Sequence, residues 1–224
     1  MNKKIIIIVI ILAAILGIIF GSLYSLNKKT SSIDNITKDE IKFKKEYEED
    51  NDKYLEINIK EDNNIIYASS DEIKEVLNTT GIIYFGFEQC PWCRNAITTL
   101  IDTVSSEEAG NIYYYNLVKE RNTLELKDNK VVETKKGTDF YNYLLNKLGD
   151  KASIYNTLND DSYKRIYMPT VLFIKDGEIV YMHESTVASQ MDPNIEMTKE
   201  QKKELSNIYL RGINLISEQC TNAC

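Results

Sequence analysis

The hydrophobic pattern of the chain begins with one long uncharged run. No residue from Ile5 to Leu26 carries a charge, and a helix of that length spans the about 30 Å hydrocarbon core of a bilayer. A cleaved signal peptide has a shorter apolar run and a small-x-small cleavage site, and no Ala-x-Ala follows here. No cysteine lies nearby, which excludes a lipoprotein anchor. The pattern predicts a transmembrane helix over residues 1–27, with a signal peptide as the alternative.

The pattern then becomes polar and afterwards amphipathic. Residues 28–52 are mostly polar and charged, and they predict a stalk with a helical part near Ile41 to Tyr47. From residue 53 to residue 224 short apolar segments alternate with turn residues, which predicts one globular domain.

In the first half of this domain, segments with the two-residue hydrophobic period of a strand alternate with segments that have the 3.6-residue period of a helix. A continuous apolar run predicts a central strand that is buried on both faces. In chain order the pattern predicts a strand over Tyr54–Ile59, a short helix that is capped by Ser70 or Asp71 and ends at Gly81, a buried strand over Ile82–Phe87, a helix after Cys90 and a strand over Ile112–Leu117. The order β-α-β-α-β is typical of an α/β fold.

The second half of the domain is irregular between residues 118 and 167 and then regular again. Thr198 and Gln201 form a capping box at the start of a last helix whose apolar stripe reaches Ile216. Before that helix the pattern predicts a helix over Asp139–Leu148, a strand over Val171–Ile174, a turn at Asp176-Gly177 and a strand over Glu178–Met182.

Charge and composition exclude several classes of protein. The net charge is −7, and no basic patch interleaved with aromatic residues occurs, so a nucleic-acid partner is not expected. His183 is the only histidine, which argues against a Cys-His hydrolase and against a metal site built from histidines.

Two of the four cysteines lie in the run "FEQCPWCRN", between the predicted central strand and its helix. Pro91 suits the first helical position because its missing N–H has no partner there in any case. Cys93 lies four residues before Ile97 on the inward face, so we expect it to be buried. Cys90 precedes the first turn, so we expect an accessible sulfur that the helix dipole favours as a thiolate. The arrangement predicts a redox couple in which Cys90 attacks and Cys93 resolves.

Two other interpretations of these cysteines are weaker. A zinc site would need Cys90 and Cys93 together with Cys220 and Cys224, but one pair follows a strand and the other ends a helix. A purely structural disulfide between Cys90 and Cys93 would close a very small loop and add little stability. We therefore expect neither a metal nor a dissociable cofactor.

The chain ends with "CTNAC", which contains Cys220 and Cys224. On a helix two residues four apart have Cα atoms about 6 Å apart, which a disulfide accepts. The pair predicts a structural disulfide, with a second redox pair that exchanges with Cys90 and Cys93 as the alternative. Paired cysteines are also typical of an oxidising compartment.

The runs "IIYFGFEQCPWCRNAITTL" and "RIYMPTVLFIKDGEIV" resemble the thioredoxin superfamily. The family pattern is a strand, Cys-x-x-Cys, a helix and then a proline that is held cis before a hairpin and faces the dithiol. Pro169 matches this proline, between Met168 and Thr170. The resemblance implies a thioredoxin-like fold with a helical insertion before the proline strand. It also implies that these three residues dock a substrate backbone, and that Trp92 contributes to the substrate surface or else covers the helix end.

Membrane-anchored extracytoplasmic thioredoxin-like proteins of Gram-positive bacteria, some of them bacteriocin-transport accessory proteins, are similar in organisation. This resemblance implies a domain held outside a bacterial cell membrane, exported proteins with thiols or disulfides as substrates, and a redox partner protein. The function it implies is thiol–disulfide exchange, and a non-catalytic accessory module of an export system is the alternative. One position departs from the family: typical thioredoxins carry a buried acidic residue six positions before the first cysteine, where this chain has Tyr84.

Overall fold

The computed structural model describes residues 36–49 and 54–217. The transmembrane helix predicted over residues 1–27, residues 28–35 and 50–52 of the predicted stalk, and both Cys220 and Cys224 lie outside the described residues. Among the helices that are described, none is both long enough and apolar enough to cross a membrane.

A five-stranded mixed sheet forms the centre of the fold, in the order β1-β3-β2-β8-β9. β2 pairs in parallel with β3, which pairs in parallel with β1, whereas β8 runs antiparallel to both β2 and β9. The central position of β2 agrees with its continuous apolar sequence. The strands are β1 (Ile65–Tyr67), β2 (Gly81–Phe85), β3 (Ile112–Tyr115), β8 (Thr170–Lys175) and β9 (Glu178–Glu184).

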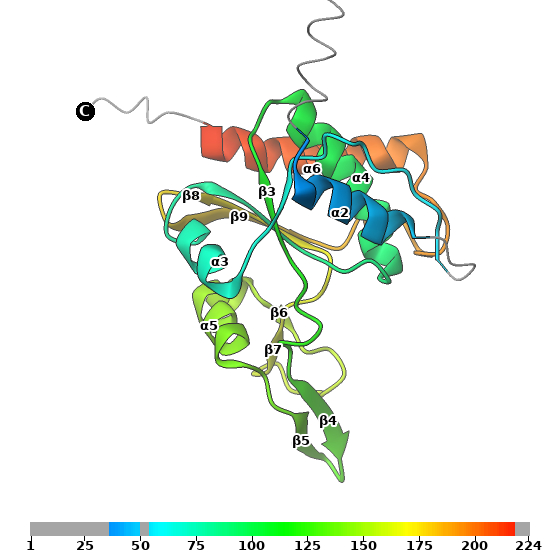
Figure 1. Cartoon of the computed structure of the whole chain (residues 1–224). Coiled ribbons are helices and arrows are strands. Elements are labelled where there is room, and N and C mark those ends of the chain that lie inside the picture. The colour runs from blue at the N-terminus through cyan, green and yellow to red at the C-terminus, as the bar shows by residue number, and fades with distance from the viewer. Residues whose placement is uncertain (1–35, 50–53, 218–224) are drawn as a thin grey trace, which may run out of the picture. The chain divides into compact units, whose positions relative to one another are not determined.

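Helices cover both faces of this sheet (Figure 1). Along β2, Ile82 and Tyr84 pack with one group of helices, and Ile83 and Phe85 pack with the other, because successive side chains of a strand point to opposite faces. The first group is α2 (Lys38–Glu48), α4 (Pro91–Ser106) and α6 (Lys199–Ser217); the second is α3 (Ser70–Val76) and α5 (Asp139–Leu148). The prediction of an α/β fold is confirmed at this level.

Local capping and turn signals were mostly sufficient to place the element ends. Helix α5 has the predicted bounds, and the capping box at the start of α6 is formed by reciprocal bonds of 2.9 and 3.2 Å between Thr198 and Gln201. The cap of α3 is Ser69, because its hydroxyl and the Glu72 carboxylate satisfy each other's backbone N–H groups. The prediction of Ser70 or Asp71 as the cap was therefore wrong by one or two residues.

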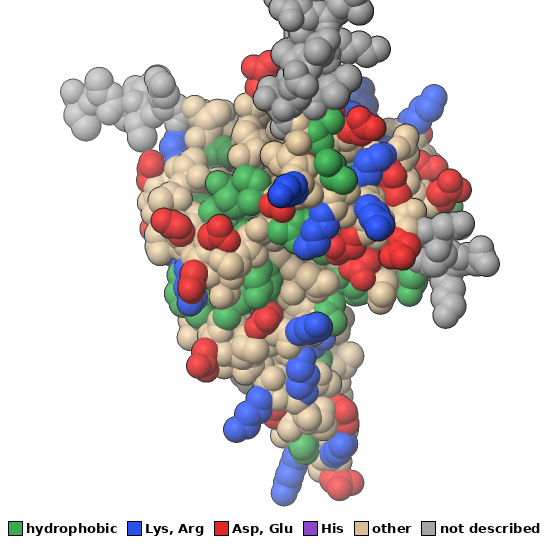
Figure 2. Space-filling model, in the orientation of Figure 1, with side chains coloured by type: hydrophobic (Ala, Val, Ile, Leu, Met, Phe, Trp, Pro, Cys, Tyr) green, Lys and Arg blue, Asp and Glu red, His purple; other side chains and the backbone are tan. Residues whose placement is uncertain are grey.

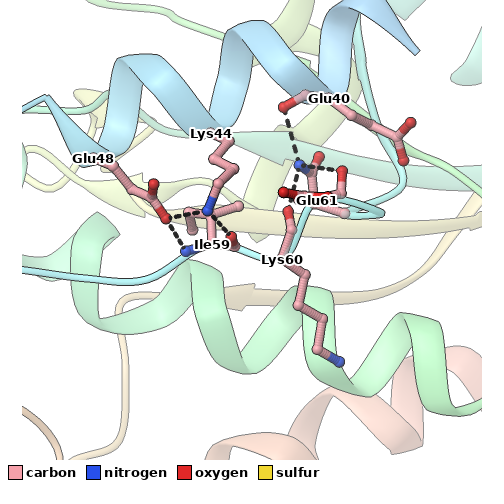
Figure 3. Close-up of polar contacts among 7 residues, drawn as sticks. Glu40, Lys44, Glu48, Ile59, Lys60 and Glu61 are labelled. Carbon is pink, nitrogen blue, oxygen red and sulfur yellow. Dashed lines mark hydrogen bonds and ion pairs between the residues drawn. The ribbon is translucent and has the colours of Figure 1, made fainter. Parts of the chain in front are cut away.

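The prediction of a strand over Tyr54–Ile59 is wrong, because this segment forms no strand. The segment alternates in burial, but its backbone pairs with side chains instead of with a neighbouring strand. Figure 3 shows the Lys44 ammonium donating to the Ile59 carbonyl at 2.6 Å, while the Ile59 N–H donates to the Glu48 carboxylate at 2.5 Å. The first strand of the sheet is instead β1, which the sequence pattern did not reveal.

Helix α2 lies within the segment that the charge pattern assigned to a stalk. Phe43 and Tyr47 are one helical turn apart on α2, and their rings stack with centroids 4.3 Å apart. Both side chains are 0% exposed. The described part of residues 28–52 therefore packs in the core with the residues that follow it.

The segment between β3 and β8 contains more strand than was predicted. Besides α5 and the short 3-10 helix η1 (Gly149–Lys151), it forms two antiparallel pairs. Basic and acidic side chains are mixed on the face of the first pair in Figure 2, and Lys127 pairs there with Glu125 at 2.9 Å. The insertion is thus only partly helical; its strands are β4 (Thr123–Lys127), β5 (Lys130–Lys135), β6 (Ser153–Ile154) and β7 (Lys164–Arg165).

At Gly212 the backbone of α6 lies close to β8. A Cβ atom at Gly212 would overlap the ring of Phe173 on β8. Phe173 is 0% exposed, so its ring has no free space to move into. The absence of a side chain at residue 212 is what allows this close contact between helix and strand.

We expect Gly212→Ala to destabilise the full-length protein, by up to about 2 kcal/mol. Overpacking of a core costs about 1–3 kcal/mol, which outweighs the about 1 kcal/mol that alanine gains over glycine inside a helix. Urea unfolding followed by circular dichroism measures the change. The matched control is Asn207→Ala, at an exposed position of the same helix, where only the gain in helix propensity applies. A higher unfolding midpoint for both variants would contradict the contact with Phe173.

Candidate functional site

Cys90 and Cys93 lie where β2 ends and α4 begins. Cys90 is the N-cap of α4, with φ −78° and ψ 116°, and Pro91 occupies the first position of the helix as predicted. The Cys90 sulfur accepts a hydrogen bond from the Cys93 N–H at 3.2 Å. The sulfur therefore takes the place of the side-chain oxygen that usually caps a helix, and it faces N–H groups that have no partner inside the helix.

The surroundings of Cys90 favour its thiolate. A hydrogen bond from the Cys93 thiol lowers the pKa of Cys90 below its ordinary value, although burial acts in the opposite direction. The backbone N–H groups of Cys93 and Trp92 lower it further, and so does the positive charge of Arg121. The expectation of an activated sulfur at this helix end agrees with these contacts.

Cys90 is less accessible than its place in the sequence suggested. Only 5% of the residue is exposed, so the expectation of an accessible sulfur was wrong. The physical reason is the loop before β8: Cys90 belongs to the same buried cluster as Met168, and its thiol donates to the Met168 carbonyl at 3.5 Å. Trp92 is half-buried and packs against this cluster. A reaction partner must therefore reach the sulfur along this loop or displace it.

Cys93 is buried, as its position on the inward face of α4 predicted. It is 0% exposed, and burial raises the pKa of its thiol well above the ordinary value. The hydrogen bond to Cys90 and the proximity of Cys90 raise that pKa further, whereas hydrogen bonds from the Phe87 backbone and the Tyr84 side chain lower it. At neutral pH Cys90 is therefore the more nucleophilic sulfur, and Cys93 holds a proton.

The structure brings the predicted docking loop against the dithiol. The Met168–Pro169 peptide bond is cis, as expected, and Met168 is 8% exposed beside Cys90. Thr170 is 0% exposed, and its hydroxyl donates to the Tyr167 carbonyl at 2.7 Å. Thr170 therefore holds the loop in shape from inside, and its side chain does not face the solvent.

A groove of about 460 Å³ adjoins this loop. Trp92 and Met168 form the part of it nearest the dithiol, and the Glu184 carboxylate, bonded at 3.1 Å to the Ser153 hydroxyl, lies in its wall. One oxygen of Glu184 is buried without a hydrogen-bond partner. The remaining lining residues are Ile154, Asn156, Tyr167 and Ser185. A larger groove of about 900 Å³ lies between residues 55–58, α4 and α6. Neither groove has a cysteine in its lining, but the smaller one includes Met168, which contacts Cys90.

Several of these residues could not be found from the sequence. Arg121 acts on Cys90 from the start of the insertion, and Glu184 enters the groove from the end of β9; no local pattern connects either of them with the dithiol. For Tyr84 the only sequence signal is its position, where the family pattern has a carboxylate. His183 is half-buried, and its Nε2 bonds to the Thr186 carbonyl at 2.9 Å.

The described residues contain no group of three or more His, Cys, Asp or Glu side chains that could hold a metal ion. Cys220 and Cys224 lie outside the described range, so neither their disulfide nor a site that joins them to Cys90 and Cys93 is tested. No protein-family model matches the chain, and no curated protein matches it either. The chemistry of the dithiol and of the loop that faces it therefore carries the functional argument.

We expect alkylation of the reduced protein by iodoacetamide to modify Cys90 before Cys93. The rate should rise with pH and level off at a pH below the ordinary thiol pKa, because the folded protein lowers the pKa of Cys90 and only the thiolate reacts. Fragment-ion mass spectrometry assigns the label to each cysteine. Earlier labelling of Cys93 would reverse the two roles.

Arg121→Gln is the matched charge variant in this experiment. Loss of the guanidinium should raise the pKa of Cys90 and slow its alkylation at pH 7 about two- to fivefold, as expected for one partly screened charge. Lys119→Gln removes a charge from an exposed side chain two residues away, so its rate should match that of the natural protein.

Proposed function

We propose that the protein is a thiol–disulfide oxidoreductase with a thioredoxin-like fold. The observation that carries this proposal is the asymmetry of the dithiol. Cys90 caps α4 and has a lowered pKa, whereas Cys93 one turn later is fully buried with a raised pKa. A helix N-terminus that favours one thiolate while a second thiol waits in the core is suited to exchange with disulfides.

The arrangement of elements supports the thioredoxin-like part of the proposal. The central strand β2 is followed by the dithiol helix, and a cis-proline, whose preceding residue Met168 contacts the first cysteine, comes before the β8–β9 hairpin. These are the features on which the sequence resemblance rests. Helix α2 precedes these features in the chain, and the mixed insertion lies between the dithiol helix and the cis-proline.

The proposed reaction begins with attack of the Cys90 thiolate on a substrate disulfide R–S–S–R′. A bond forms between Cys90 and the sulfur of R, and R′ leaves as a thiolate. Cys93 then gives its proton to the R′ thiolate and attacks the Cys90 sulfur, which releases R as a thiolate. Two electrons pass from the dithiol to the substrate, and the protein is left with a Cys90–Cys93 disulfide. The reverse sequence oxidises a substrate dithiol.

The groove beside Met168 and Trp92 fits a polypeptide substrate better than a small thiol. Cys90 is only 5% exposed, so a partner needs contacts along the loop in order to bring a disulfide to the sulfur. We propose that exported proteins with thiols or disulfides supply this segment, and that a separate redox protein resets the dithiol. Pro169 and Met168 would then lie under the bound chain.

We expect Cys93→Ser to accumulate mixed disulfides through Cys90. Without the resolving thiol, the first exchange step proceeds and the second cannot. The purified full-length variant is incubated with insulin, whose intact disulfides serve as a model protein substrate. Non-reducing gels and mass spectrometry then measure the trapped species. Cys90→Ser is the matched control and should trap nothing. Equal trapping by both variants, or by neither, would contradict the assignment of Cys90 as the attacking residue.

A second function is favoured by the same small exposure of Cys90. Cys90 is 5% exposed and Cys93 is 0% exposed. In this second function the dithiol takes part in no exchange, and the fold serves for binding alone, as an accessory module of an export system. The two functions separate in a turnover assay. A natural protein that reduces or oxidises the insulin disulfides no faster than the Cys90→Ser variant supports the binding module, and faster turnover supports the oxidoreductase.

We expect the dithiol domain to lie outside the cytoplasm, held by the uncharged run from Ile5 to Leu26. Protease added to intact bacterial protoplasts that express the chain should then digest residues from about 30 onward, while a cytosolic marker protein stays intact. Protection of both proteins would place the dithiol in the cytosol. That outcome would exclude exported substrates without excluding exchange chemistry.

A further inference from the structure

The groove beside Trp92 and Met168 contains one charged side chain. Its described lining residues come from α4, the insertion, the loop before β8 and the end of β9, and Glu184 is the only Asp, Glu, Lys, Arg or His among them. Much of the remaining wall is apolar or aromatic, as at Trp92, Ile154 and Tyr167. In a groove of this kind a single charged group has a strong influence on which ligand fits.

The backbone of Glu184 is fixed relative to the loop that contacts the dithiol. Glu184 pairs with Thr170 across the β8–β9 ladder, so it lies opposite the residue that follows Pro169. The next residue, Ser185, donates its backbone N–H to the Pro169 carbonyl at 2.8 Å. The loop whose Met168 carbonyl contacts the Cys90 thiol is thus tied directly to the end of β9.

The Glu184 side chain is held from the insertion, but most of its capacity to accept hydrogen bonds is unused. The Ser153 hydroxyl of β6 donates to one carboxylate oxygen at 3.1 Å. The second oxygen is buried and meets no donor at bonding distance among the described residues. A carboxylate has about four lone-pair sites, so Glu184 can accept further donors from a molecule that enters the groove.

The charge of Glu184 is not neutralised by a neighbouring side chain. None of the ion pairs formed by the described residues includes it. Arg165 lies opposite Ser153 in the β6–β7 pair, but its guanidinium packs over the Tyr155 ring, 4.4 Å from the centroid. Burial raises the pKa of Glu184, while the Ser153 hydroxyl and the Tyr167 N–H lower it. Because a half-buried charge without a partner is unfavourable, a cation in the groove would meet a carboxylate that lacks one.

We propose that Glu184 selects substrates that carry a lysine or arginine beside the reacting cysteine. This inference rests on the oxidoreductase function proposed above, because it names the substrate class of the same site. The groove includes Met168, which contacts Cys90, so a chain that brings a disulfide to Cys90 places its neighbouring side chains in the groove. Glu184 takes no part in the exchange itself, and no proton or electron passes through it.

A long cationic side chain fits both parts of the groove. The carbon stem of a lysine or arginine packs on apolar surface while its charged end stays at a polar site, and here Trp92 and Ile154 offer the apolar surface. A leucine would cover the same surface but would leave Glu184 without a partner. The net charge of −7 attracts cationic chains in general, whereas Glu184 distinguishes the residue next to the cysteine.

The test measures binding without sulfur chemistry. Trp92 is the only tryptophan of the chain and lines the groove, so its fluorescence reports an occupied groove. Short peptides with serine in place of cysteine, and with lysine, glutamine, leucine or glutamate on either side of it, are titrated into the reduced full-length protein. We expect the lysine peptide to bind about five- to tenfold more tightly than the glutamine peptide, which is more than an exposed ion pair provides and less than a fully buried one. Added salt should reduce the difference.

Glu184→Gln keeps the shape of the side chain and removes its charge, so the preference for lysine over glutamine should fall to within about twofold. Glu178→Gln is the matched control and should keep the preference, because Glu178 is an exposed residue of the same strand outside the groove lining. Ile154→Lys is the second test if Glu184→Gln does not fold. Ile154 lines the groove and is 40% exposed, and an ammonium group there should also remove the preference.

The outcomes separate this inference from the proposed function. Equal binding of the lysine and glutamine peptides, tighter binding of the leucine peptide, or a preference that survives in Glu184→Gln or Ile154→Lys would make the inference wrong. The cysteine forms of the same peptides, as mixed disulfides with glutathione, then give kcat/KM for exchange. Exchange that ignores the flanking residue leaves the oxidoreductase function standing and overturns the inference. A preference that depends on Glu184, with exchange no faster than in Cys90→Ser, confirms the cation site and makes the proposed oxidoreductase function wrong.

Discussion

The hydrogen bond from the Cys93 N–H to the Cys90 sulfur, 3.2 Å long, joins the fold to the chemistry. It exists because the short connection from β2 to α4, residues 86–90, ends at Cys90, which is the N-cap of the helix. An oxygen side chain in that position would cap equally well, and the choice of sulfur places a thiol at the positive end of the helix. The same geometry puts residue 93 one turn further on, where the helix faces the core. One cap thus produces both the reactive sulfur and the sheltered one.

Groups from distant parts of the chain act on the two sulfurs. Arg121, at the start of the insertion, lowers the pKa of Cys90, whereas the Met168 carbonyl in the loop before β8 accepts a hydrogen bond from its protonated thiol. Burial in the core raises the pKa of Cys93. The insertion therefore has an electrostatic influence on the site besides its place in the groove wall, and changes to it should alter reactivity as well as substrate binding.

The parts of the structure that the sequence predicted are those governed by neighbours along the chain. Continuous apolar sequence identified β2, Pro91 marked the first turn of α4, and Thr198 with Gln201 marked the start of α6. The failures share one cause. The alternation over Tyr54–Ile59 is real, but alternation reports only which side chains are buried, and here side chains of α2 satisfy the backbone. The exposure of Cys90 likewise depends on a loop 78 positions away in the sequence.

Helix α2 shows how a charged sequence can conceal a structural role. Its many lysines and glutamates indicated a solvated stalk, yet the stacked pair of Phe43 and Tyr47 is fully buried on the sheet. These rings pack against Tyr114 and, through the Tyr47 hydroxyl, against Tyr84. Helices α4 and α6 cover the rest of this face, and without α2 the part that Phe43 and Tyr47 cover would be open to water. The segment that leads into the domain therefore belongs to the core that supports β2, the strand from which the chain runs to Cys90.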